Sequence, residues 1–353
     1  MKNSNIDNIA IDETKPIVTQ GVESTLSLKA ISKPLVTHIY TADPSAHVFN
    51  NKIYIYPSHD VENDLPLGDD GDHFDMRDYH VISLDKPYGE ATDHGNALDV
   101  KDVKWAERQM WAPDAAEKDG KYYLYFPAKN YQGIFHIGVA VGTQPEGPFV
   151  PEETHIAGSF SIDPAVYQDD DNQYYLLFGG ISGGQLQNWR DGKFAEERYT
   201  ADNEPALKPI IAKLADNMVD LAEAPREIDI LDENGEQLLA GDIDRRYFEG
   251  PWMHKHNGIY YFSYSTGDSH KIVYAISDSP YGPFNYQGVI LEPVIGWTTH
   301  HSIAKFEEKW YLFYHDSSLS GGQTHLRNIK MTELTHNSDN SIQTIKPYFE
   351  KSE

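Results

Sequence analysis

The chain has 353 residues, 39% of them hydrophobic and 12% aromatic, and its formal net charge is −26. A field of this sign repels phosphate backbones and excludes a nucleic-acid partner, whereas it does not hinder a neutral ligand. The absence of cysteine excludes disulfides and thiolate chemistry. No window approaches the roughly 18 apolar residues of a membrane span, and residues 1–16 lack the apolar run of a secretory signal. We therefore expect a cytoplasmic protein with no membrane partner.

Five short tyrosine-rich segments resemble one another along the chain, and each follows a turn signal such as Asp119-Gly120 or Asn257-Gly258. Their aligned tyrosines are Tyr54, Tyr123, Tyr175, Tyr261 and Tyr311. Extended runs joined by such turns predict β-hairpins. The shorter intervals between these tyrosines are about 50 residues, which matches a four-stranded propeller blade. We therefore predict an all-β, five-bladed β-propeller.

The propeller is expected to occupy residues 34–335. Residues 1–33 are polar and form either a tail or an edge strand, and residues 336–353 complete or flank the propeller. The third interval between tyrosines is the longest, so residues 200–240 are predicted to be an insertion. Within it, Leu214, Met218 and Leu221 fall at helical spacing, which predicts helical stretches there.

An ionisable residue stands nine to twelve positions before each aligned tyrosine: Asp43, Asp114, Asp163, Glu249 and His300. Residues at the entry of the innermost strands of a propeller converge on its central channel. Several carboxylates around one axis are electrostatically costly unless a substrate, proton or cation uses them, and the crowding raises at least one pKa, as a general acid requires. Each Asp could instead cap a turn, but the full set favours a functional site.

The contexts of these residues resemble glycoside hydrolase family 43, five-bladed propeller enzymes that act on arabinose- and xylose-containing polysaccharides. The resemblance runs from about Tyr40 to Lys330. Its motifs are Asp43-Pro44, Trp111-Ala112-Pro113-Asp114, Asp163-Pro164-Ala165, Glu249-Gly250-Pro251 and His300-His301-Ser302. The resemblance assigns no role to Asp114.

The resemblance implies a role for each of three carboxylates. Asp43 matches the general base that activates water, Glu249 the general acid that protonates the leaving oxygen, and Asp163 the carboxylate that orients the acid and adjusts its pKa. The family inverts configuration in one displacement. An inverting pair of carboxylates stands roughly 6.5–9.5 Å apart to admit the water, and opposite sides of a propeller channel can provide that gap.

The resemblance also implies an axial site around His300, often beside one calcium ion with waters, a cation that oxygen ligands suit. His301 could be the relevant histidine instead, as a substrate contact. A buried core histidine is the alternative for His300. The acidic cluster at residues 69–73 could form part of the pocket rim, bind a cation, or be a solvated loop.

Three further residues are candidate substrate contacts. Arg327 resembles an arginine that contacts sugar hydroxyls at the bottom of the pocket, with a surface arginine as the alternative. Trp111 and Phe248 are apolar walls for a sugar ring, although each could belong to a blade core. Trp252 and Trp297 are weaker candidates of the same kind.

These features predict an inverting glycoside hydrolase that releases terminal pentose from neutral oligosaccharides, as an α-L-arabinofuranosidase, a β-D-xylosidase or both. Enzymes of the same fold that act on arabinan, galactosides or fructosides are alternatives, although Ala42-Asp43-Pro44-Ser45-Ala46 differs from the Asn-Asp-Pro-Asn-Gly usual in fructosidases. A propeller that only binds carbohydrate is a third possibility, but it would not need acidic residues at all three positions.

Overall fold

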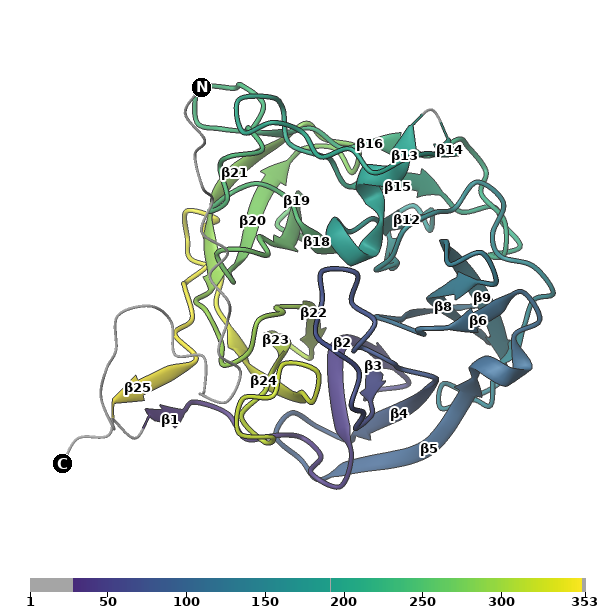
Figure 1. Cartoon of the computed structure of the whole chain (residues 1–353). Helices are drawn as coiled ribbons and strands as arrows, with labels where there is room; N and C mark the ends of the chain where they lie inside the picture. The colour runs from purple at the N-terminus through teal and green to yellow at the C-terminus, as the bar shows by residue number, and fades with distance from the viewer. Residues whose placement is uncertain (1–27, 191, 351–353) are drawn as a thin grey trace.

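The computed structural model describes residues 28–190 and 192–350, which build five β-sheets around a central axis (Figure 1). Within these residues the only helical elements are three short 3₁₀ turns. No helix in the described part of the chain is long and apolar enough to cross a membrane. The prediction of an all-β, five-bladed propeller is confirmed.

The blades follow one another in chain order. Blade 1 contains β2 (Tyr40–Phe49), β3 (Lys52–Asp60), β4 (Asp78–Leu84) and β5 (Ala91–Asp99). Blade 2 contains β6 (Ala106–Arg108), β7 (Asp114–Lys118), β8 (Lys121–Asn130), β9 (Phe135–Gly142) and β10 (Val150–Pro151). Blade 3 contains β11 (Ala165–Gln168), β12 (Tyr174–Phe178), β15 (Ile210–Lys213) and β16 (Arg226–Glu227). Blade 4 contains β18 (Glu249–His256), β19 (Ile259–Ser265), β20 (Ile272–Ser277) and β21 (Phe284–Leu291), with β17 (Ile230–Leu231) parallel to β21. Blade 5 contains β22 (His301–Phe306), β23 (Lys309–Asp316) and β24 (Asn328–Leu334).

The smaller elements lie outside these sheets. They are β1 (Leu28–Ala30) paired with β25 (Tyr348–Glu350), the hairpin of β13 (Trp189–Arg190) and β14 (Lys193–Phe194), and the 3₁₀ turns η1 (Val100–Asp102), η2 (Ser182–Gly184) and η3 (Leu186–Asn188).

The aligned tyrosine of every blade lies on the strand that pairs with the innermost strand, namely β3, β8, β12, β19 or β23. The turn before this strand lies at the residues that the sequence indicates. Asn50 and Asn51 have φ of 51° and 60°, and Asp119 and Gly120 have φ of 54° and 74°. Two consecutive left-handed residues match the right-handed twist of the flanking strands, so these turn residues fix the register of the inner hairpins of blades 1 and 2.

Hydrogen bonds between innermost strands join the blades. Asp114, fully buried, accepts from the His47 ring at 2.6 Å and from the Val166 N–H at 2.5 Å, and so connects β7 with β2 and β11. Ser302 accepts from the Ala46 N–H at 3.0 Å, which joins β22 to β2. Asp114 therefore holds blade 2 to blades 1 and 3 through its hydrogen bonds.

Both ends of the described chain run along the propeller. The Leu35 N–H donates to the Ile329 carbonyl at 2.9 Å, so the segment before β2 lies along β24. The Ile345 N–H donates to the carbonyl of Ile290 in β21, and its carbonyl accepts from the N–H of Glu292, the residue just after β21. Residues 28–30 of the predicted N-terminal segment form strand β1, and residues 1–27 lie outside the described residues.

The prediction of helical stretches in residues 200–240 is wrong. Leu214 bridges Leu221 in antiparallel fashion, and Met218, with φ of 64°, sits in the turn between them. The Asn217 side chain accepts from the N–H groups of Val219 and Asp220 at 3.2 Å. Such local side-chain bonds compete with helix formation, so the run becomes a hairpin tip that still buries Leu214 and Met218.

Candidate active site

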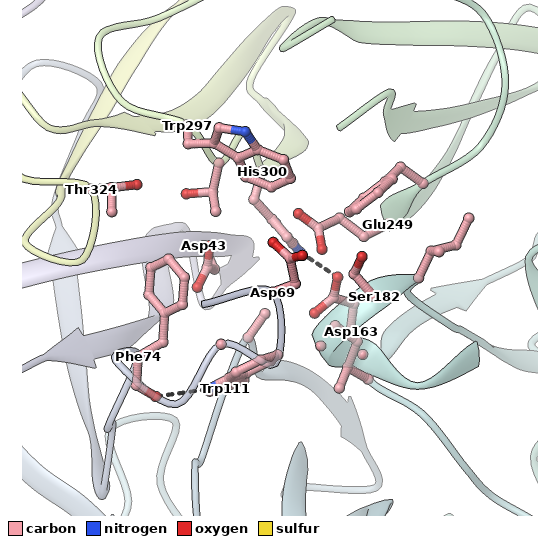
Figure 2. A pocket seen from close by; sticks show the side chains of 18 of the residues that line it. Asp43, Asp69, Phe74, Trp111, Asp163, Ser182, Glu249, Trp297, His300 and Thr324 are labelled. Atoms are coloured by element: carbon pink, nitrogen blue, oxygen red, sulfur yellow. Dashed lines mark hydrogen bonds and ion pairs between the residues drawn. The ribbon is translucent and has the colours of Figure 1, made fainter. Parts of the chain in front are cut away.

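A cavity of about 650 Å³ lies where the innermost strands begin (Figure 2). It is lined by six of the seven candidate catalytic and substrate-contact residues, all except His301, and also by His300. Its volume is typical of a small-molecule site. The members among the predicted residues are Asp43, Trp111, Asp163, Phe248, Glu249, His300 and Arg327. The propeller thus brings residues from all five blades to one place.

Local backbone irregularities aim the carboxylates. Asp43 and Asp163 have φ of 48° and 57°, a left-handed conformation that Asp tolerates better than most residues. The pairing of β2 with β3 shifts register between Ala42 and Ser45, and that of β18 with β19 shifts just after Glu249. Bulges of this kind re-aim side chains beside active sites.

Asp43 is held as a carboxylate. Its oxygens accept from the Ser58 hydroxyl at 2.7 Å and from Arg327 Nη1 at 2.9 Å. Burial by itself would raise the pKa of Asp43, but the Arg327 guanidinium and His315 outweigh burial and hold that pKa well below its usual range. Asp43 therefore stays ionised at a pH where an ordinary aspartate would take up a proton.

Arg327 is buried, which excludes a surface role for it. Its Nε and Nη2 donate to the two oxygens of Asp60 at 2.8 and 2.7 Å, while Nη1 donates to Asp43. A planar guanidinium can make this bidentate pair and still reach a third oxygen. Arg327 lines the cavity, but its principal contacts are carboxylates, so it fixes Asp43.

The pKa values of Glu249 and Asp163 are raised, in contrast to that of Asp43. Burial raises the pKa of Glu249 well above its usual value, and the nearby Asp163 and Asp43 raise it further. Burial and the Asp43 charge also raise the pKa of Asp163, while the Gly250 N–H, donating to Asp163 at 2.9 Å, opposes this. Like charges in one low-dielectric pocket cannot all ionise, so the Glu249–Asp163 pair retains a proton.

The two adjacent histidines face different ways. His300 lines the cavity, with Nε2 3.7 Å from Asp163, and neither ring nitrogen has a hydrogen-bond partner among the described residues. Burial lowers the pKa of His300 to about 4. His301 begins β22, is fully buried and contacts the Ser263 hydroxyl at 2.6 Å. Successive strand residues point to opposite faces, so the structure does not bring His301 to the cavity as a substrate contact.

Aromatic rings form the walls. Phe248 packs edge-to-face on Trp297 at 5.8 Å, and Trp111 lies 6.1 Å from Phe74 in the same manner. The Trp111 indole N–H donates to the Phe74 carbonyl at 2.8 Å (Figure 2). Trp297 therefore lines the site, whereas Trp252 packs between blades and donates to the Ile303 carbonyl.

The acidic cluster at residues 69–73 forms part of the rim. Asp69, Gly71 and His73 line the cavity from the connection between β3 and β4. Gly71 has φ of 71°, and a Cβ there would lie 2.6 Å from the Trp111 ring. The loop thus needs glycine to lie against the wall of the site.

The sequence matches the family described as "Glycosyl hydrolases family 43" over residues 34–342. The chain belongs to glycoside hydrolase family 43. This confirms the family identified from the sequence motifs, and family 43 is a family of inverting glycoside hydrolases.

The matches to named relatives span most of this chain and nearly all of each relative. The chain is 58% identical to xylosidase/arabinosidase 43A of Humicola insolens, over 89% of this chain and 99% of the relative. It is 52% identical to a β-xylosidase of Xylanibacter ruminicola, over 87% and 97% of the two chains.

Two solved structures share the fold closely. A family 43 β-xylosidase/α-arabinofuranosidase from a compost microbial metagenome, in complex with xylotriose and described as a calcium-free form, has a TM-score of 0.89 and 63% identity, covering 92% of this chain and all of that one. A family 43 enzyme of Xanthomonas citri, complexed with xylotriose, has a TM-score of 0.86 and 61% identity, covering 90% and 94%.

Several residues of this family 43 site escaped the sequence analysis. Asp60 and His315 hold Arg327 and Asp43, and Phe74 and Thr298 line the cavity. Phe74 follows directly on the acidic cluster, so the cluster gave a local signal. Asp60 and His315 carried none, because each is an ordinary polar residue near the end of a strand, β3 or β23.

Proposed function

We propose that this family 43 enzyme removes terminal β-D-xylosyl and α-L-arabinofuranosyl residues from xylo-oligosaccharides by a single inverting displacement. The observation that carries the proposal is one cavity holding a carboxylate kept ionised, Asp43, and a carboxyl group kept protonated, Glu249. Two titratable groups whose environments push their pKa values apart suit a base and an acid. The names of the relatives support the choice of sugars.

The residues divide the reaction as follows. Glu249 donates its proton to the glycosidic oxygen as the bond from the anomeric carbon to that oxygen breaks. Asp43 takes a proton from a water whose oxygen attacks the anomeric carbon from the opposite face, so the released sugar has inverted configuration. Asp163 does not touch the reacting atoms; its charge and proximity keep the proton on Glu249. Aromatic walls such as Trp111 and Phe248 pack on the sugar's C–H faces.

We also propose one calcium ion, with its waters, beside His300. A buried ring with two nitrogens that lack hydrogen-bond partners among the described residues fits such a neighbour. When bound, the ion would supply positive charge near the carboxylates. Metal analysis of the purified protein after dialysis against calcium, compared with His300→Ala, tests this; equal calcium in both would exclude the site.

The assignment of acid and base can be tested by varying the leaving group. 4-Nitrophenol leaves without much help from an acid, whereas the sugar leaving group of xylotriose needs protonation. Glu249→Gln should therefore lose far more activity on xylotriose than on 4-nitrophenyl β-D-xyloside. Asp43→Asn should lose about equally on both, because water activation is needed in either case. Equal losses in Glu249→Gln would remove Glu249 as the acid.

The products test the rest of the proposal. Proton NMR at early times should show α-xylose released from xylotriose before mutarotation, with xylobiose as the co-product. Initial release of β-xylose would indicate a retaining displacement. Activity on 4-nitrophenyl α-L-arabinofuranoside measures the second specificity. Tight xylotriose binding without hydrolysis by the unaltered enzyme would leave only the binding-propeller alternative.

A further inference from the structure

A histidine–aspartate cluster lies on blade 1, outside the residues that line the cavity. It consists of His59 at the end of β3 and of Asp78 and His80 at the start of β4, all partly buried. Each offers one potential ligand atom, and these atoms lie within 4.8 Å of one another. His59 precedes Asp60, which holds Arg327; since successive strand residues point to opposite faces, the cluster lies on the other face of β3.

A second layer of residues holds this cluster in place. The His80 Nδ1 pairs with Asp93 at 2.9 Å, and Asp93 also accepts from His38 at 2.7 Å and from the Gly95 N–H at 2.8 Å. With His80 Nδ1 occupied, its Nε2 remains for another partner, and that atom lies 3.8 Å from Asp78 Oδ2. A carboxylate that binds the far nitrogen of a histidine is the usual support of a metal-ligating imidazole.

Asp78 is oriented in the same way. Its Oδ2 accepts from the Asn96 side chain at 2.8 Å, while its Oδ1 lies 2.7 Å from His59 Nδ1. The rings of His59 and His80 are 4.6 Å apart between centroids. Two imidazoles and one carboxylate therefore converge on a small volume. Asp93 supports His80 and Asn96 supports Asp78, while His59 shares with Asp78 a proton that a metal ion could replace.

We propose that His59, Asp78 and His80 bind one divalent transition-metal ion of the zinc class. Two imidazole nitrogens and a carboxylate oxygen suit zinc, whereas calcium prefers a shell of oxygens. Zinc–ligand bonds of about 2.0–2.2 Å in tetrahedral geometry place neighbouring ligand atoms roughly 3.3 Å apart. His59 Nδ1 lies 2.7 Å from Asp78 Oδ1 and His80 Nε2 lies 3.8 Å from Asp78 Oδ2, so the two imidazoles approach the two oxygens of one carboxylate. One ligand atom from each residue lies within 4.8 Å of the other two. Water completes the fourth position.

This site is separate from the calcium proposed beside His300 and does not depend on the proposed function. Zinc would replace the proton shared by His59 and Asp78 and tie the end of β3 to β4. Two strands now joined by hydrogen bonds would then also share a metal, which stabilises the folded state because the ligands converge only there.

Calorimetric titration with zinc chloride, after treatment with a chelator, tests the proposal. The chelator-treated protein should bind zinc with a stoichiometry one higher than that of His59→Gln/His80→Gln. His94→Gln is the matched control, because His94 lies on β5 of the same blade, pairs with Ser83 and should leave zinc binding unchanged. Equal stoichiometry in the double variant would overturn the site and leave only His–Asp ion pairs.

A second measurement separates lost ligands from lost folding. Thermal unfolding is measured for each protein with chelator and then with zinc, so that each is compared with its own metal-free midpoint. Added zinc should raise the midpoint of the unaltered chain by more than that of the double variant. Anomalous diffraction at the zinc edge should place a peak between His59, Asp78 and His80. An ordered blade 1 without a peak there, in crystals soaked with zinc, would refute the proposal.

Discussion

Asp114 and Glu249 stand at the same point of two blades but behave differently. Each is the first residue of an innermost strand, β7 or β18. Asp114 is fully buried and receives hydrogen bonds from His47 and Val166. Glu249 is partly exposed to the cavity, and no residue of the described chain donates a hydrogen bond to its carboxyl group.

The position of a carboxylate in the repeat brings it near the propeller axis, and its hydrogen-bond donors decide whether it is structural or catalytic. A carboxylate whose lone pairs are filled by neighbouring strands holds blades together. One left without donors in a buried, negatively charged pocket has its pKa raised and becomes an acid. Stability and activity should therefore separate cleanly between these two residues.

The largest expected effect is on Glu249. Glu249→Gln should lower kcat/KM on xylotriose by about 10²- to 10⁴-fold, since it removes the proton donor. Its free energy of unfolding should not fall, because the change removes a poorly solvated acid. Steady-state kinetics and urea unfolding of the same preparation check both statements. A loss of activity matched by a loss of folded protein would contradict the assignment.

Asp114 should show the reverse. Asp114→Asn leaves one of two buried donors without an acceptor, which costs about 2–4 kcal/mol of unfolding free energy. The folded fraction should retain kcat/KM within a few-fold of the unaltered enzyme. A double-mutant cycle with His47→Gln measures the coupling directly. A strong kinetic defect at unchanged stability would place Asp114 in the reaction instead.

Much of the fold and site could be predicted because the signals are local and repeated. Turn residues such as Asn50-Asn51, within a few positions of the aligned tyrosine, predict each hairpin. The prediction is stronger because the same pattern occurs five times. The carboxylates follow from the same register. Asp43, Asp163 and Glu249 could therefore be placed at one cavity without any knowledge of long-range contacts.

What failed depends on contacts that sequence spacing does not encode. Arg327 meets Asp60 across 267 positions of the chain, so its guanidinium could not be assigned to carboxylates in advance. Strand β22 begins at His301, and the sequence alone does not show where this strand begins. It therefore could not decide which of His300 and His301 faces the cavity. Leu214 and Met218 satisfied a helical pattern, but the Asn217 turn turned that run into a hairpin.

The pH dependence sharpens the comparison further. Activity needs the Glu249–Asp163 pair to hold a proton, and because the pKa of Glu249 is raised, kcat/KM should remain high above pH 4.5 and then fall about tenfold per unit beyond the pair's pKa. Asp114→Asn should keep the same alkaline limb, whereas Glu249→Gln should lose it on 4-nitrophenyl β-D-xyloside. An alkaline limb that persists in Glu249→Gln would assign it to another group.

The smallest expected effect concerns the acid limb, which Asp43 sets. Asp43 must be ionised, so activity is lost as pH falls through its pKa, and Arg327 holds that pKa low. Lysine offers a point charge and cannot pair with both oxygens of Asp60 while reaching Asp43. In Arg327→Lys the acid limb should therefore move upward by about 1–3 pH units.

Thr298→Val is the matched control. It removes the hydroxyl that accepts from Arg327 at 3.3 Å and contacts His315 Nε2 at 3.0 Å, while the guanidinium stays in place and His315 Nε2 keeps the Thr298 carbonyl at 3.0 Å. Its acid limb should coincide with that of the unaltered enzyme. Normalised pH profiles from brief assays separate this shift from any loss of folded protein. If Arg327→Lys also keeps its acid limb, the Ser58 and His315 contacts hold Asp43 ionised without the arginine, and Arg327 serves the cavity chiefly through its pair with Asp60.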